Sequence, residues 1–235
     1  MAMDLPEARR MLAAAAARPE LTAQIVPSPF TLKWDATICR LVRDGYLGRL
    51  LRVEARGVVG SGFPDAAEPL HWRQERALSG NNIMMMGIFY EALRRWVGDA
   101  ASVMVMGSVN VRERARADSG EKVAIDIPDD IDILCRMQKD GALAHLHFST
   151  TTGLADRPMQ FWLHGSEGTI CLSPTAADPA MQFRGGRRGD AELAPIEVPA
   201  DEASAWRVEE EVRDGPRSGA RGGACAAGRV SLASR

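Results

Sequence analysis

The richest group of residues able to bind a ligand lies between Pro69 and Gly98, in the segment PLHWRQERALSGNNIMMMGIFYEALRRWVG. Arg73 directly follows Trp72, and a permanently charged guanidinium beside an indole suits a substrate hydroxyl, a carboxylate or a cofactor phosphate. The structural alternative for Arg73 is a salt bridge to Glu75 or Asp65. Both interpretations remain open from the sequence.

Two asparagines precede the apolar run of the same segment. Asn81 and Asn82 could cap the helix that follows or donate hydrogen bonds to a ligand, and capping is the favoured interpretation.

Two histidines are separated by one residue in a strand-like stretch. His145 and His147 point to the same face, as metal ligands or a solvated polar row would, and Ser149 and Thr151 continue that face. No carboxylate or cysteine lies at ligand spacing along the chain, and His164 belongs to another strand. The sequence therefore favours a solvated row and predicts no metal site.

Composition limits the class of protein. The chain has 235 residues, of which 46% are hydrophobic, so a buried core is expected. With 29 basic and 31 acidic side chains the net charge is -2, which disfavours a nucleic-acid partner. No apolar run approaches the roughly 18 residues of a membrane span, and the acidic start is unlike a signal peptide. We expect a cytoplasmic protein whose widely spaced cysteines are reduced core residues.

The first elements read as a helix and a strand. Asp4 is placed to cap a helix that runs to about Ala17, and 22–26 reads as a short strand. Asp35 is expected to cap a second helix, which is followed by an alternating strand over 49–56. The run 57–62 follows this strand, but its spacing is not G-x-G-x-x-G, so a flexible loop is favoured over a phosphate site.

The later elements read as one long helix and several strands. Ile83 to Val97 predicts the helix, and Ser102 to Arg112 alternates as a strand. Two hairpins follow, with turns at 139–142 and 165–168. The prediction is an α+β fold with an open, mainly antiparallel sheet and helices on one face. A helix-strand remnant of a doubly wound α/β domain would precede it.

The segment described first resembles the second domain of the Gfo/Idh/MocA oxidoreductases, which carries W-R, a run of small residues, and D-x-G-x-H opening a helix. The matching residues are Trp72, Arg73, Ser79, Gly80 and Gly87. Met85 stands where the family usually has Asp, and Phe89 where it has His. The resemblance covers most of residues 1–212 and keeps the fold pattern without that Asp/His pair.

The resemblance implies a domain division. Residues 1–30 would be the end of the nucleotide-binding (Rossmann) domain, 31–212 the C-terminal α+β substrate and oligomerisation domain, and 213–235 a disordered or non-native tail. Enzymes of the family bind NAD or NADP through a glycine-rich turn and use a lysine from a Glu-Lys-Pro segment. Because the sequence contains no G-x-G-x-x-G turn, we expect this chain alone to hold no cofactor.

The resemblance also implies a function. The intact parent would be an NAD(P)-dependent oxidoreductase (dehydrogenase) acting on a sugar- or polyol-like substrate, and it would be a homo-oligomer that pairs through its sheet. Candidates for the substrate side are Lys33, Trp72, Arg73, Asn82 and Tyr90. Tyr90, Glu91 and Lys33 are the candidate substitutes for the missing proton-transfer pair. The alternative function is a non-catalytic sugar-binding or assembly module.

Overall fold

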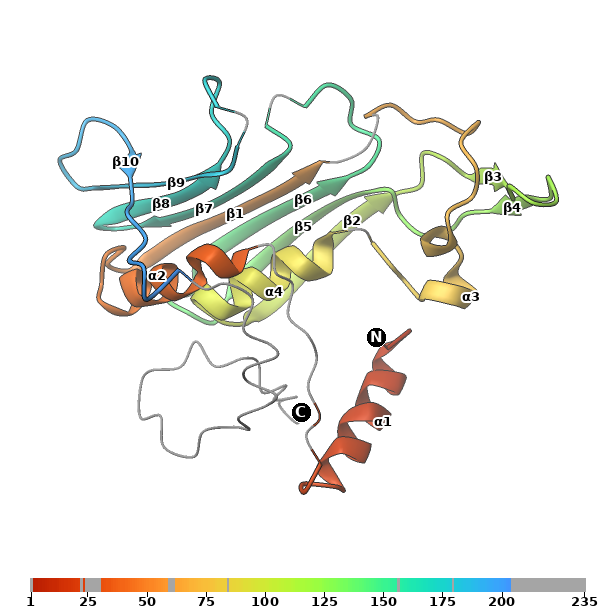
Figure 1. Cartoon of the computed structure of the whole chain (residues 1–235), viewed down its shortest axis with the longest axis horizontal. Helices are drawn as coiled ribbons and strands as arrows, with labels where there is room; N and C mark the ends of the chain where they lie inside the picture. Colours follow the sequence, from red (N-terminus) through yellow and green to blue (C-terminus); the bar gives the residue numbers. More distant parts are fainter. Residues whose placement is uncertain are drawn as a thin grey trace.

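A computed structural model describes residues 2–21, 23, 31–58, 62–83, 85–155, 157–178 and 180–203 of the chain. Its main body is an open sheet of eight strands, and helices α2 (Leu32–Arg43) and α4 (Met86–Val97) lie together on one face (Figure 1). The predicted α+β architecture is confirmed. We call the opposite face, which carries the side chains of Glu54, Arg56, Asp132, Leu134, His145, His147 and Trp162, the open face.

The sheet has the strand order β10-β9-β8-β7-β1-β6-β5-β2. All neighbours are antiparallel except β1 and β6, which are parallel. The strands are β1 (Leu50–Val58), β2 (Ala100–Ser108), β5 (Asp130–Met137), β6 (Leu143–Ser149), β7 (Met159–Gly165), β8 (Gly168–Ser173), β9 (Gln182–Arg187) and β10 (Ala194–Pro195). A separate ribbon pairs β3 (Glu113–Ala115) with β4 (Lys122–Ala124).

Helix α1 (Leu5–Ala16) begins as expected, because the Asp4 carboxylate accepts the backbone N–H of Glu7 at 2.7 Å. It buries no residue and stands apart from the sheet (Figure 1). The expected strand at 22–26 and the expected tail at 213–235 lie outside the described residues, apart from residue 23. The structure therefore does not test those assignments.

The expected cap of α2 is wrong. Thr31 is the N-cap, and Asp35 lies in the first turn with a side chain only 10% exposed. Its carboxylate accepts the indole N–H of Trp96 at 2.7 Å and pairs with Arg95 at 2.8 Å. A buried carboxylate needs such partners, so Asp35 joins α2 to α4 rather than capping a helix.

Strand β1 shows the expected alternation with one irregularity. Val53 and Ala55 are buried under the helices, but Leu51 is 41% exposed. The register shifts between Leu50 and Arg52, which turns Leu50 into the core in place of Leu51.

Helix α4 supplies the centre of the core. Phe89 is fully buried, stacks on Phe161 with centroids 4.6 Å apart, and meets Phe148 edge-on at 5.3 Å. Gly57 of β1 lies under this cluster, because an added Cβ would come within 3.2 Å of the Phe89 ring. The helix starts at Met86, three residues later than expected, and ends at Gly98 with φ of 86° as expected.

Both predicted hairpins are confirmed. Asp140 and Gly141 have φ of 57° and 65°, the left-handed values that an Asp-Gly turn needs between β5 and β6. The turn between β7 and β8 differs, because Gly165 is required by packing and not by a positive φ. A Cβ there would lie 2.0 Å from the carbonyl oxygen of Leu47.

Strand β2 is shorter than expected and does not have a buried face. It forms an edge of the sheet, and Val103, Met104, Val105 and Met106 are all at least half exposed. Within the described part of the chain, every helix is too short or too polar to cross a bilayer.

Candidate functional site

A cavity of about 410 Å³ lies where the 62–83 segment meets the end of β6 and the 110–129 segment. Its apolar lining is Phe63, Ile83, Val111, Ile127, Pro128 and Phe148, and its polar lining is Asp65, Glu68, His71, Arg73, Gln74, Asn82, Arg114, Asp129, Ser149, Thr150 and Thr151. An apolar surface with several polar groups around it suits a small ligand that carries hydroxyl groups.

A short 3-10 turn, η2 (Trp72–Gln74), holds one side of the cavity. His71 Nδ1 accepts the backbone N–H of Arg73 at 3.2 Å, and Gln74 Oε1 accepts the backbone N–H of His71 at 3.0 Å. These reciprocal bonds are a capping box, so the sequence His-Trp-Arg-Gln fixes its own turn.

Arg73 does not form the salt bridges that were its structural alternative. Its guanidinium carbon lies 4.3 Å from the centroid of the Trp72 ring. Glu75 instead pairs with Arg116 at 2.6 Å, and the Asp65 carboxylate accepts the backbone N–H of Ala67. Among the residues that the structure describes, no carboxylate is paired with Arg73, so its N–H groups are available to a ligand.

Arg114 was not among the residues expected from the sequence, and it reaches the cavity from β3, some forty positions after Arg73 along the chain. Its side chain is 13% exposed and pairs with Glu68 at 3.3 Å, and Nη2 donates to the carbonyl oxygen of Asp65 at 2.9 Å. Its Nε is buried and has no hydrogen-bond partner among the described residues. No local sequence pattern identifies Arg114 as a cavity residue, because it reaches the cavity only through the ribbon that β3 forms with β4.

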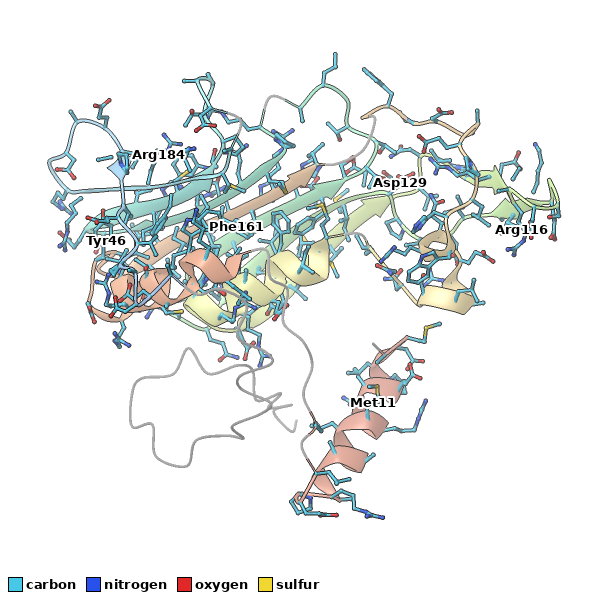
Figure 2. All side chains as sticks on the ribbon, in the orientation of Figure 1. Met11, Tyr46, Arg116, Asp129, Phe161 and Arg184 are labelled. Carbon is cyan, nitrogen blue, oxygen red and sulfur yellow. The ribbon has the colours of Figure 1, made fainter. Side chains whose placement is uncertain are left out.

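Asp129, which is labelled in Figure 2, also lines the cavity. Its carboxylate accepts the backbone N–H groups of Asn110 and Val111, at 2.9 and 2.8 Å, and the side-chain amide of Asn110 at 3.0 Å. Three donors satisfy this carboxylate, so Asp129 holds the backbone of Asn110 and Val111 in place at the cavity.

Asn81 and Asn82 have different roles in the structure. Asn82 lines the cavity, whereas Asn81 accepts a hydrogen bond from Arg76 at 3.3 Å. The capping interpretation is wrong, since the N-cap of α4 is Met85, whose φ of 66° is left-handed and which makes no side-chain cap. Left-handed backbone at a non-glycine residue costs about 1–3 kcal/mol.

The structure brings Arg73 and Asn82 together and places Trp72 against Arg73, but it leaves the other candidates elsewhere. Lys33 is an exposed residue of α2, with its amine 5.4 Å from the Trp34 ring. The remaining two face other partners: the Tyr90 hydroxyl accepts the backbone N–H of Ala100 at 3.1 Å, and Glu91 pairs with Arg95 at 2.6 Å.

His71 offers the cavity a donor and not a base. Since Nδ1 accepts a backbone N–H, the neutral ring carries its proton on Nε2. His71, Arg73 and Asn82 all line the cavity and all carry N–H donors, which can bind hydroxyl and carbonyl oxygens.

Comparisons with known proteins agree with this fold. No curated protein matches the sequence. A levoglucosan dehydrogenase in complex with NADH and L-sorbose is 20% identical, with 75% of this chain and 49% of that chain covered and a TM-score of 0.61. An NAD binding oxidoreductase from Klebsiella pneumoniae is 17% identical, with 83% and 51% covered and a TM-score of 0.67.

The transcriptional regulator Gal80p from Kluyveromyces lactis is 15% identical, with 91% of this chain and 56% of that chain covered and a TM-score of 0.68. The chain thus spans about half the length of these solved structures, and at such identities the likeness concerns the fold. The family model described as the GFO/IDH/MocA C-terminal domain matches residues 36–171. Because that match covers more than half of the sequence, the chain belongs to the Gfo/Idh/MocA family.

Proposed function

We propose that the cavity beside Trp72 and Arg73 binds a carbohydrate-like or polyol ligand, as the substrate side of an NAD(P)-dependent oxidoreductase. The observation that carries the proposal is the guanidinium of Arg73, which lies over the Trp72 ring at the cavity and pairs with no carboxylate in the described part of the chain. Asn82 and His71 add donors that suit a ligand with several hydroxyl groups. NAD or NADP would supply the hydride acceptor, and this chain's own residues would bind and orient the alcohol.

A ligand titration tests the binding part of this proposal. Levoglucosan, L-sorbose and a neutral polyol are titrated into the full chain while heat and tryptophan fluorescence are recorded. We expect saturable binding that weakens at least tenfold in Arg73→Ala. Arg136→Ala is the matched control, because Arg136 is an exposed arginine on β5, away from the cavity. Unchanged affinity in Arg73→Ala, or equal weakening in the control, would contradict the assignment.

The second candidate function is a non-catalytic ligand-binding or assembly module. A specific observation favours it: Phe89 and Met85 occupy the positions of the family's His and Asp, and Phe89 is sealed in an aromatic core. The Gal80p structures, which are described as a transcriptional regulator, have the same fold. Ligand binding without NAD(P)-dependent oxidation by the whole protein would support this module, whereas coupled formation of NAD(P)H would support the enzyme.

We further propose that the open face pairs with a second copy of the chain. Met104, Met106, Leu134 and Leu143 leave large apolar side chains half exposed or more on that face. Sedimentation of the purified chain should show a dimer or larger species, and Leu134→Glu should shift it toward monomer. A wild-type chain that stays monomeric at tens of micromolar would refute the pairing.

A further inference from the structure

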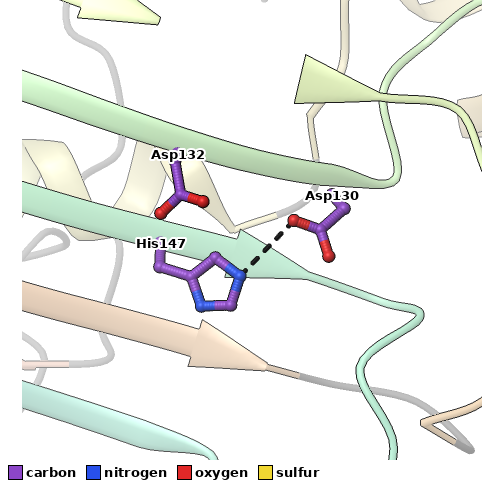
Figure 3. A group of neighbouring side chains, drawn as sticks. All are labelled: Asp130, Asp132 and His147. Carbon is purple, nitrogen blue, oxygen red and sulfur yellow. Dashed lines mark ion pairs between the residues drawn. The ribbon is translucent and has the colours of Figure 1, made fainter. Parts of the chain in front are cut away.

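The open face carries a cluster of two carboxylates and one histidine, Asp130, Asp132 and His147, where β5 begins and β6 ends (Figure 3). Asp130 and Asp132 are two positions apart on β5, and His145 and His147 are two apart on β6, so all four share one face. The sequence argument against a metal site was the absence of a carboxylate near the histidines. That premise is wrong in three dimensions, because the antiparallel register sets Asp132 directly opposite His147.

The distances within the cluster fit metal ligands better than a simple hydrogen-bonded row. His147 Nε2 lies 3.4 Å from Asp130 Oδ1, which exceeds an ordinary hydrogen-bond length of about 2.7–3.2 Å. Two ligands on a tetrahedral zinc, each bound at about 2.1 Å, are separated by about 3.4 Å. One ligand atom from each of Asp130, Asp132 and His147 lies within 4.8 Å of the others. The Asp132 side chain is 54% exposed, so no tight packing fixes it and a bound cation could draw its carboxylate closer.

Neighbouring side chains hold the carboxylates in suitable orientations. Ser149 donates its hydroxyl hydrogen to Asp130 Oδ2 at 2.9 Å, and the Thr152 hydroxyl lies 3.2 Å from the same oxygen and 2.8 Å from Ser149 Oγ, which leaves Oδ1 directed toward His147. His145 Nε2 lies 2.7 Å from Asp132 Oδ1. Such outer partners orient ligands in metal sites and raise metal affinity.

We propose that Asp130, Asp132 and His147 form a divalent-cation site, for which zinc is the best match, with the fourth position open to water. Carboxylate oxygens and imidazole nitrogens both bind zinc, and three protein ligands with an open fourth position is the arrangement of catalytic zinc sites. Arg56 is the cation opposite His147 in the parallel ladder, and the two carboxylates outweigh its single charge. The site lies on the open face next to the cavity beside Trp72, since Ser149 lines that cavity and also donates to Asp130, and all three ligands come from one chain.

Zinc binding to the full chain, measured by competition with a chromophoric chelator, tests the proposal. We expect one zinc per chain, with affinity at least tenfold lower in His147→Gln and in Asp130→Asn. His164→Gln is the matched control, since His164 stacks on Trp162 at 5.6 Å outside the cluster, and its affinity should stay within twofold of wild type. Cobalt in place of zinc should give the intense visible absorption of a tetrahedral site.

Thermal unfolding of each variant is followed by circular dichroism, so that loss of a metal ligand can be distinguished from loss of the fold. Thr152→Val keeps all three ligands and removes one hydroxyl from Asp130, so we expect about tenfold weaker zinc binding from it. A folded wild-type chain that binds no zinc would overturn the proposal, and the cluster would then be a solvated ion-pair row. Zinc binding that is unchanged in His147→Gln would overturn it too, because the metal would then be held elsewhere, for example by cysteine thiols.

Discussion

Phe89 occupies the position at which the family usually has a histidine, and restoring that histidine should destabilise the fold without creating a proton carrier. Phe89 is fully buried between Phe161 and Phe148. Each such aromatic pair is worth about 0.5–1.5 kcal/mol, so Phe89→Leu should lower the free energy of unfolding by about 1–3 kcal/mol. Phe89→His loses the same pairs and also buries an imidazole among aromatic rings, which costs a further ~1–3 kcal/mol.

The difference in unfolding free energy between Phe89→His and Phe89→Leu should also depend on pH. A histidine buried at position 89 should have a pKa below that of the unfolded chain, because burial disfavours the charged ring. The unfolded state then binds the extra proton below about pH 6.5, so the stability of Phe89→His should fall further in acid. Burial also lowers the pKa of His164, but both variants share that residue and its effect cancels in their difference.

Urea unfolding followed by circular dichroism, at pH 8 and at pH 5.5, measures these differences. Equal m-values for the two variants would license the comparison of their free energies. A Phe89→His variant as stable as Phe89→Leu at both pH values would refute the buried-core interpretation, because position 89 would then have to reach solvent or a polar partner. Gly57 packs against the Phe89 ring and limits any such relaxation.

Three further predictions concern packing and ionisation. Hydrogen bonding to Arg40 lowers the pKa of the Glu202 carboxyl, so the stability that this carboxylate contributes is fully present above about pH 4.3 and is lost as the pH falls through the lowered pKa. Glu202→Gln should therefore cost about 1 kcal/mol or less at pH 7 in urea unfolding, and this cost should shrink in acid. Burial raises the pKa of Cys171 to about 11, so its thiol should react with Ellman's reagent at pH 8 only on unfolding, and fast reaction of the native chain would contradict this. Gly165→Ala should lower the free energy of unfolding by about 3 kcal/mol, because its Cβ would meet the Leu47 carbonyl, whereas Gly141→Asn, at an open left-handed turn position, should change it far less.

Local sequence signals predicted the elements better than their partners. The Asp140-Gly141 turn and the Asp4 cap depend on neighbours within a few residues, and both are found in the structure. Asp35 looked like another cap, but its partner Arg95 lies sixty residues away, and a local rule cannot find such a contact. Local sequence could not predict the exposure of Met106 either, because only the strand order shows that β2 is an edge strand.

The candidate site shows the same limit. Arg73 was identifiable because its neighbour Trp72 forms part of its environment. Arg114 and the pairing of Asp132 with His147 were not, since each depends on strand contacts that form across the sheet. Position 89 could be aligned with the family by its spacing, but only the three-dimensional packing shows that the side chain is sealed.

The parallel pairing of β1 with β6 has a consequence for how this chain acquires its structure. Strand β1 ends at residue 58, yet its two sheet neighbours begin at residues 143 and 159. During synthesis its hydrogen-bonding edges and apolar side chains therefore stay without a partner while more than eighty further residues are added. Contacts so distant in sequence slow folding and leave the nascent chain open to aggregation, so this domain should depend on chaperones more than a helical bundle of equal size.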